Sequence, residues 1–190
     1  MAEISRRLSP ERRARIVDAA RHLILRQGLR ATTMEAIARE AKIAKPTLYS
    51  YFSDKEAVFA AIIQALVDDI LAAFDRALHG DGDAVARIGA ALAAKYRVIG
   101  KLLEGSPHAD ELYSEHDRTA AAQFMAVDRQ VEEAITATSR EAGVARPNAL
   151  AQLLLASAYG IGRKATVPAE AGPAIRLMVE RLVRPELAGV

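Results

Sequence analysis

The sequence predicts an all-helical protein, and three observations lead to that prediction. Hydrophobic residues, mainly Ala, Leu, Ile and Val, make up 51% of the 190-residue chain. They recur with a period close to 3.6 in nearly every segment, as expected of helices that each bury one face. Glycine and proline mark the breaks between these segments. Counting the segments gives about nine helices, four before Gly80 and five after it.

The first predicted helix begins at Ser9-Pro10 and ends at Gly28. Serine is a good N-cap, proline is tolerated in the first helical turn, and glycine suits the left-handed position that closes a helix. An apolar stripe at helical spacing lies between these signals, formed by Ile16, Ala20, Leu23 and Ile24.

Two short helices joined by a tight turn are predicted next. Thr32 or Thr33 can cap the first of them, and Glu35 completes a capping box with Thr32. This helix must end near residues 42–43, because Pro46 is tolerated only in the first turn of the helix that follows. The second helix then runs from residue 44 or 45 to residue 52. This layout is that of a helix-turn-helix, in which the second helix enters the major groove of DNA.

The second short helix has two different sides. Leu48 and Phe52 are four residues apart and are expected to face the protein core. The opposite side carries small or hydrogen-bonding residues, namely Lys45 at the leading end and then Pro46, Thr47, Tyr49 and Ser50. Such a side suits contact with sugar, phosphate and base edges.

A long fourth helix is expected to follow without a linker, from about residue 54 to residue 78. Ser53 and Glu56 form a capping-box pattern at its start. Turn signals then delimit five further helices, at about 83–103, 106–115, 117–142, 147–164 and 168–184. We therefore divide the chain into a helix-turn-helix domain at residues 1–53 and a second helical domain at residues 54–190.

Charge supports the assignment of the first domain to nucleic acid. Residues 1–52 contain eleven Lys or Arg against five Asp or Glu, whereas residues 53–190 contain fifteen against nineteen. A basic excess at the groove-binding helix is the expected electrostatic footprint of DNA binding. For the arginines near the amino terminus, a solvated basic tail is the alternative interpretation.

About the first sixty residues resemble the amino-terminal domain of the TetR family of bacterial transcriptional regulators. The residues that carry the resemblance are Ile16, Ala19-Ala20, Gly28, Thr32-Thr33, Ile37-Ala38, Ala41, Thr47-Leu48-Tyr49, Tyr51-Phe52 and Lys55-Glu56. The resemblance implies DNA contacts, mostly to phosphates, from Thr33, Lys45, Thr47, Tyr49, Tyr51 and Lys55, with Lys45, Pro46 and Ser50 nearest the bases.

Two positions in the turn depart from the family pattern. Lys42 stands where the family usually has glycine, and Ala44 stands where it usually has serine. We expect Lys42 to adopt a positive φ, which is costly for a residue other than glycine. We also expect the second short helix to lack a side-chain cap, because alanine has no acceptor.

The last two long helices are the predicted homodimer interface. They carry many small residues, which allow helices to approach closely, and two helices from each subunit can form a four-helix interface. The predicted interface residues are Leu150, Leu153, Leu154, Ser157, Ile175, Met178 and Leu182. A tightly packed monomer core is the alternative explanation of the same residues.

The middle helices, about 83–142, are the predicted chamber for a small-molecule effector, as the resemblance implies. Its candidate lining residues are Tyr96, His108, Tyr113, His116, Phe124 and Tyr159, because a pocket between helices is typically apolar with a few polar groups. Taken singly, each of them is better explained as ordinary core or surface. The histidines and neighbouring carboxylates match no metal-ligand spacing, so no metal or cofactor is predicted.

Several classes of protein are disfavoured. The chain has no cysteine, which excludes disulfides and thiolate chemistry. It shows no signal peptide, and its longest apolar stretch, Leu153–Gly162, is too short to span a membrane. A cytoplasmic protein is therefore expected. The sequence contains no glycine-rich phosphate-binding loop and no nucleophile motif, so an enzyme is not expected.

The sequence thus predicts a TetR-like, ligand-responsive repressor that binds a pseudo-palindromic operator as a homodimer. A DNA-binding protein with an architectural or partner-recruiting role and no effector is the main alternative, and an enzyme is a more distant one. The sequence does not identify the effector, the operator or the target genes, and it leaves repression and activation open.

Overall fold

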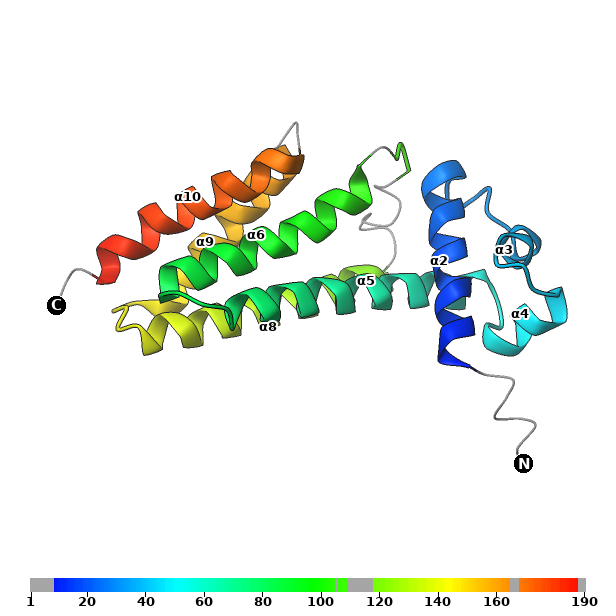
Figure 1. Ribbon diagram of the computed structural model, residues 1–190, viewed down its shortest axis with the longest axis horizontal. Coiled ribbons are helices and arrows are strands. Elements are labelled where there is room, and N and C mark those ends of the chain that lie inside the picture. Colours follow the sequence, from blue (N-terminus) through cyan, green and yellow to red (C-terminus); the bar gives the residue numbers. More distant parts are fainter. Residues whose placement is uncertain (1–8, 105, 109–117, 165–167, 188–190) are drawn as a thin grey trace, which may run out of the picture. The chain divides into compact units, whose positions relative to one another are not determined.

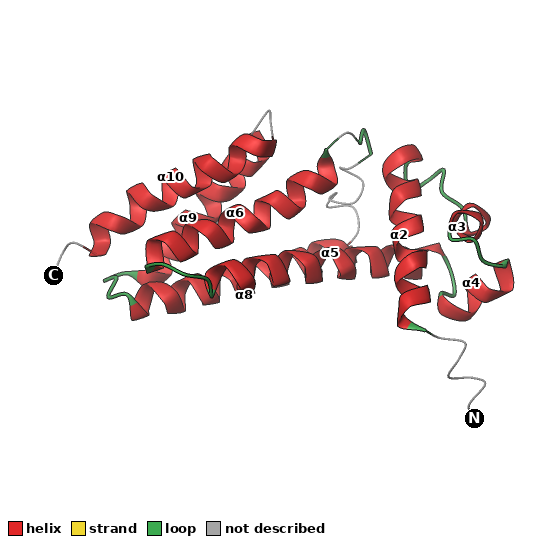
Figure 2. Ribbon diagram, in the orientation of Figure 1, coloured by secondary structure: helices red, strands yellow, loops and turns green. Residues whose placement is uncertain are grey.

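The computed structural model describes residues 9–104, 106–108, 118–164 and 168–187. Eight helices and no strand are found in this part of the chain, which confirms the all-helical prediction (Figures 1 and 2). The helices are α2 (Pro10–Gln27), α3 (Met34–Glu40), α4 (Lys45–Tyr51), α5 (Lys55–Leu78), α6 (Ala84–Leu103), α8 (Arg118–Glu141), α9 (Pro147–Lys164) and α10 (Pro168–Leu187).

Most helix boundaries agree with the turn signals of the sequence. The short helix predicted at residues 106–115 lies largely outside the described residues. Residue 117, the predicted cap of the next helix, lies outside them as well. Helix α10 was predicted to end near Pro185, but it continues to Leu187 with Pro173 and Pro185 inside it. Each proline removes its own N–H donor and crowds the carbonyl four residues before it, while the donors of the residues that follow remain and can continue the helix.

The chain forms two compact units. Unit 1 comprises residues 1–66 and 105–123, and unit 2 comprises residues 67–104 and 124–190. Helices α5 and α8 contribute to both units. These units are defined by packing. The domain boundary predicted between residues 53 and 54 is instead a division by function, and this division stays a prediction.

In unit 1, α2 packs against α3 and α3 packs against α4, as the blue-to-cyan ribbon of Figure 1 shows. The largest fully buried side chains are aliphatic and come from all three helices and from the first half of α5: Ile16, Ile24, Ile37, Leu48, Ile62 and Ile63. This core fixes the three short elements against one another, because burying each such side chain stabilises the fold by about 1.5–3 kcal/mol.

Side-chain caps set the helix starts in unit 1, with two corrections to the prediction. Thr33 caps α3, its Oγ1 accepting from the Ala36 N–H at 3.2 Å, whereas Thr32 is buried and donates to the Gly28 carbonyl. Glu35 is then two residues from the cap instead of three, so the predicted capping box is absent. Asp54, not Ser53, caps α5 by accepting from the Ala57 N–H at 2.7 Å.

In unit 2, α10 packs against both α6 and α9, and α6 packs against α9. Helices α6 and α9 meet closely at Gly162 of α9, where a Cβ atom would lie 2.8 Å from Cε1 of Tyr96 on α6 and closer still to its Cδ1. Tyr96 is buried. Glycine at this position therefore makes room for the aromatic ring.

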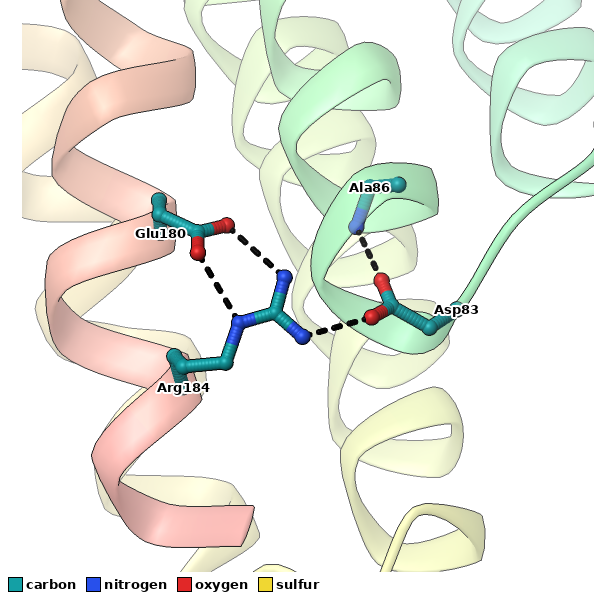
Figure 3. A network of polar contacts seen from close by, with 4 residues as sticks. All are labelled: Asp83, Ala86, Glu180 and Arg184. Atoms are coloured by element: carbon teal, nitrogen blue, oxygen red, sulfur yellow. Dashed lines mark hydrogen bonds and ion pairs between the residues drawn. The ribbon is translucent and has the colours of Figure 1, made fainter. Parts of the chain in front are cut away.

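Arg184 joins the last turns of α10 to the first turn of α6 (Figure 3). Its Nη1 donates to Oδ2 of Asp83 at 2.7 Å, and its Nε donates to Oε1 of Glu180 at 2.8 Å. Asp83 also caps α6, with Oδ1 accepting from the Ala86 N–H at 2.9 Å. The Ala86 N–H and then Arg184 lower the pKa of Asp83, and Arg184 lowers the pKa of Glu180. Both carboxylates are thus favoured in their charged form.

Helix α5 is long and apolar enough to cross a membrane if only its length and composition are considered. Half of the qualifying window is buried inside the protein. Its apolar residues include Phe59, Ile62, Ile70 and Phe74, all of them buried. This burial is what a core helix of the fold requires.

Candidate nucleic-acid interface

Helix α4 presents two distinct sides, as its sequence predicts. Leu48 and Phe52 are buried against the rest of unit 1. On the other side Lys45, Pro46, Tyr49 and Ser50 are exposed, with Tyr49 45% exposed, and Thr47 is half-buried. Helix α4 therefore offers a polar and aromatic edge while its apolar side holds it in place. We call Lys45, Pro46, Thr47, Tyr49 and Ser50 the α4 edge.

Contacts from α2 hold the carboxyl end of α4. The Tyr51 hydroxyl accepts a hydrogen bond from the Ser9 N–H at 3.0 Å. The Arg13 guanidinium lies 5.2 Å from the centre of the Phe52 ring, a distance typical of a cation–π contact. The sequence predicts only a DNA contact for Tyr51. No local pattern indicates its bond to Ser9, because the two residues are 42 positions apart.

Lys55 also makes an internal contact. Its Nζ donates to the Leu29 carbonyl at 3.0 Å, which joins the start of α5 to the loop after α2. An ammonium group has three donors, so this bond leaves capacity for a phosphate. The predicted phosphate contact of Lys55 is compatible with this geometry and remains a prediction.

The turn between α3 and α4 closes with a Schellman motif. The Lys42 N–H bonds to the Arg39 carbonyl at 3.1 Å, and the Ile43 N–H bonds to the Ala38 carbonyl at 2.9 Å. The motif requires a left-handed residue at the position of Lys42, and Lys42 has φ 55°, the one positive φ outside glycine among the described residues. The positive φ expected at this departure from the family pattern is confirmed.

Replacing Lys42 with glycine is expected to raise the free energy of unfolding by about 0.5–1 kcal/mol, because glycine adopts a positive φ without steric cost. Urea unfolding monitored by circular dichroism measures the change. Gly143, with φ 85°, occupies the equivalent position after α8. The reverse substitution Gly143→Lys should therefore lower stability, and a loss of stability in Lys42→Gly would contradict the strain argument.

The leading end of α4 is held by Lys45 instead of by a cap. Ala44 makes no side-chain cap bond, as expected. The Lys45 ammonium forms an ion pair with the Glu35 carboxylate of α3 and lies 5.9 Å from the centre of the Tyr49 ring. The hydrogen bond and charge of each partner lower the pKa of Glu35 and raise the pKa of Lys45. Sequence reasoning missed the role of Glu35, which it had placed in a capping box.

The predicted effector residues have different environments. Tyr96 is buried, Phe124 and His108 are half-buried, and Tyr159 is 56% exposed. Tyr113 and His116 lie outside the described residues. A surface cavity of about 410 Å³ in unit 2 is lined by other residues, which are Arg129, Glu132, Glu133, Thr136, Arg140 and Asn148. The effector residues therefore remain a prediction. In the part of the chain that the structure describes, no three His, Asp or Glu side chains converge as metal ligands.

The predicted dimer residues also divide by burial. Leu150, Leu154 and Ile175 are buried in the core of unit 2 itself. Leu153 is exposed, and Ser157, Met178 and Leu182 are half-buried. Tyr159 and Leu177, which the predicted interface did not include, are more than half exposed. Leu153, Tyr159 and Leu177 are thus the exposed large apolar side chains among the described residues of α9 and α10. The dimer interface itself stays a prediction.

The three-helix core, the tight turn and the exposed α4 edge together define a helix-turn-helix domain of the DNA-binding class. Residues 16–62 match the family described as "Bacterial regulatory proteins, tetR family". The chain therefore carries the amino-terminal domain of the tetR family, as the sequence resemblance implied.

Individual relatives agree with this assignment. The chain is 31% identical over 126 residues to the HTH-type transcriptional activator FasR of Mycolicibacterium smegmatis, covering 66% of this chain and 56% of that protein. The chain spans about half the length of the curated relatives it matches. These relatives are transcriptional regulators and not enzymes, in agreement with the predicted absence of catalysis.

Solved structures share the fold over nearly the whole chain. A transcriptional regulator of the TetR/AcrR family from Thermobifida fusca has a TM-score of 0.69 at 27% identity, covering 94% of this chain and 98% of that one. AibR, solved in complex with isovaleryl coenzyme A and operator DNA, has a TM-score of 0.62 at 20% identity, covering 90% and 98%. At that identity the AibR match shows the fold alone.

Proposed function

We propose that the protein is a transcriptional regulator that binds operator DNA through α4 as a homodimer and releases it in response to a small molecule. The observation that carries the proposal is the α4 edge, which is exposed and polar although both Leu48 and Phe52 on the other side are buried. A helix held in this way can enter a major groove without losing its place in the core. The basic excess of residues 1–52 supplies attraction to phosphate.

The homodimer is proposed on the apolar surface of α9 and α10. Leu153 and Tyr159 of α9 and Leu177 of α10 are 50–58% exposed. Exposed large apolar side chains on two helices that pack together can supply an interaction surface. The small residues Ala149 and Ala156 are exposed on α9, so a second helix could approach closely. A two-fold dimer would place two copies of α4 on two half-sites of a palindrome.

The effector and the direction of regulation are proposed from family likeness. AibR, which shares the fold, is known in complex with both a coenzyme A thioester and operator DNA, so this architecture can serve both ligands. By linkage, an effector that releases DNA must bind the DNA-incompetent form more tightly, and operator DNA must weaken effector binding by the same factor. We propose repression, with activation as the other outcome of the test.

The test is a gel-retardation assay on the DNA upstream of the gene and its neighbours, with and without candidate metabolites. We expect one fragment to be retarded and a metabolite to relieve the retardation, and sedimentation equilibrium should give a dimer. Retardation that no compound relieves would favour an architectural role. Failure to bind any duplex at low salt would overturn the proposal. Transcription from the bound promoter in vitro separates repression from activation.

Replacing Lys55 with alanine is expected to weaken binding to all DNA sequences by a similar factor. Loss of one phosphate contact per subunit should flatten the slope of log K against log salt by about 0.9 per bound subunit. Fluorescence anisotropy at several salt concentrations measures both effects. Lys55→Arg keeps the charge and should retain most of the slope. A change of preference at a single base position in Lys55→Ala would show that the phosphate assignment is wrong.

A further inference from the structure

The Lys45 ammonium is already paired in the protein without DNA. It forms an ion pair with Glu35 of α3, and the side chains of Lys45 and Glu35 are 52% and 54% exposed. The Tyr49 ring lies 5.9 Å from the same ammonium. The leading residue of the α4 edge is thus held between a carboxylate of the neighbouring helix and an aromatic ring of its own helix.

Glu35 stands in an unfavourable place for a protein that approaches phosphates. Its carboxylate competes with phosphate for the Lys45 ammonium and repels phosphate directly. The cap of α3 does not need it, because Thr33 Oγ1 accepts from the Ala36 N–H. It is one of only five acidic residues in the basic stretch of residues 1–52. Glu35 lies in the first turn of α3, where a carboxylate favours the helix, but other first-turn positions would serve α3 without placing a negative charge beside the α4 edge.

We propose that Glu35 is a selectivity residue that withholds Lys45 from indiscriminate contact with DNA. The ion pair persists in the free protein and in loose complexes with arbitrary sequence, and it breaks only where the fit to an operator compensates for its loss. Nonspecific binding comes almost entirely from phosphate contacts. A lysine that is withheld from phosphate therefore weakens nonspecific binding and stays available at the operator. This inference rests on the proposed function.

Both partners are about half exposed, so the ion pair is weak enough to be exchanged for a phosphate contact. Exposed ion pairs contribute about 0.2–1 kcal/mol. A residue that blocked DNA binding outright would need a much stronger hold on Lys45. The exposure of the pair thus fits a contact that is kept in loose complexes and surrendered in a well-fitted one.

The test variant is Glu35→Gln, which preserves the size of the side chain and removes its charge. We expect its affinity for a duplex of arbitrary sequence to rise about three- to tenfold, through loss of the competing ion pair and of the repulsion, acting in two subunits. Because Lys45 then reaches phosphate, log K should fall more steeply with log salt, by about 0.9 per bound subunit. Fluorescence anisotropy between about 50 and 200 mM salt measures both quantities.

Glu40→Gln is the matched control. Glu40 is exposed, lies on the same helix α3 and forms no ion pair with the described residues. The Glu40→Gln substitution removes the same charge without freeing Lys45. Its effect on DNA affinity should therefore be smaller, and the slope of log K against log salt should be unchanged. The second arm repeats Glu35→Gln in a Lys45→Gln background. There the gain should disappear, because Glu35 is proposed to act through Lys45.

Three results would overturn the inference. Equal gains and equal slopes in Glu35→Gln and Glu40→Gln would reduce Glu35 to a general charge effect. A gain that persists without Lys45 would show that Glu35 acts on DNA directly. A changed preference at one particular base position in Glu35→Gln would make Glu35 a reader of bases.

The proposed function and this inference can fail separately. If the unaltered protein retards a promoter fragment and the two Glu variants behave alike, only the inference falls. If neither the unaltered protein nor any variant binds duplex DNA at low salt, both fall. Thermal unfolding of each variant, expected to be nearly unchanged for exposed side chains, confirms that folded proteins are compared.

Discussion

The Tyr49→Ala variant is expected to bind the operator about thirtyfold or more weakly, since loss of an edge contact costs about 1–3 kcal/mol at each of two half-sites. Tyr49 is 45% exposed and lies on the α4 edge beside the Lys45 ammonium. Its truncation should leave the fold almost unaffected, because the substitution of an exposed side chain usually changes stability by less than about 0.5 kcal/mol.

Fluorescence anisotropy on the operator fragment, with circular dichroism and sedimentation equilibrium on the same preparation, tests this expectation. The dimer and the helical signal should match the unaltered protein. Tyr49→Phe keeps the ring and removes the hydroxyl. The part of the operator affinity that it loses measures the hydrogen bond, and the part that it keeps measures the contact of the ring. Unchanged operator affinity in Tyr49→Ala would refute the role assigned to this side chain.

A methyl group at Gly162 should lower the free energy of unfolding by about 1–3 kcal/mol, the usual cost of overpacking a filled site. A Cβ there would lie 2.8 Å from Cε1 of Tyr96, well inside van der Waals contact. Tyr96 is buried in unit 2 and its ring is rigid, so the clash can be relieved only by moving the ring or separating α6 from α9.

Gly160 provides the matched control, two residues earlier on the same helix. A Cβ at Gly160 meets nothing within 4 Å, and alanine favours a helix over glycine by about 1 kcal/mol. Gly160→Ala should therefore raise stability while Gly162→Ala lowers it. Urea unfolding measures both, with unchanged m values expected. Equal effects of the two substitutions would contradict the packing argument.

Local signals explain why so much of the fold could be predicted. Ser9, Gly28 and Asp83 act at helix ends as their residue types indicate, since a cap depends on the backbone within three residues. The two sides of α4 followed from the helical period alone. Even the positive φ of Lys42 could be expected from the turn that the motif requires.

Contacts through space were not predictable in the same way. Three contacts depend on how the helices pack, and the helical period of the sequence does not encode this packing. They join Glu35 to Lys45, Ser9 to Tyr51, and Lys55 to Leu29.

For a related reason, the sequence does not separate core residues of α9 from candidate interface residues. Helix α9 carries apolar residues on both of its sides, so Leu153 and Leu154 look alike in the sequence. Only packing shows that Leu154 faces the subunit's own core and that Leu153 faces outward. A helical period identifies an apolar stripe, but it does not say what covers the stripe.

The Arg184–Asp83 bond has a consequence for folding during synthesis. Its two residues are 101 positions apart, which a ribosome takes about 5–20 s to translate. Throughout that interval the beginning of α6 must rely on its own cap, since the helix that will cover it does not yet exist. The segments α2 to α4 find their partners much sooner in the nascent chain. Unit 2 should therefore fold later than unit 1, and it is the unit that chaperones would bind before it has folded.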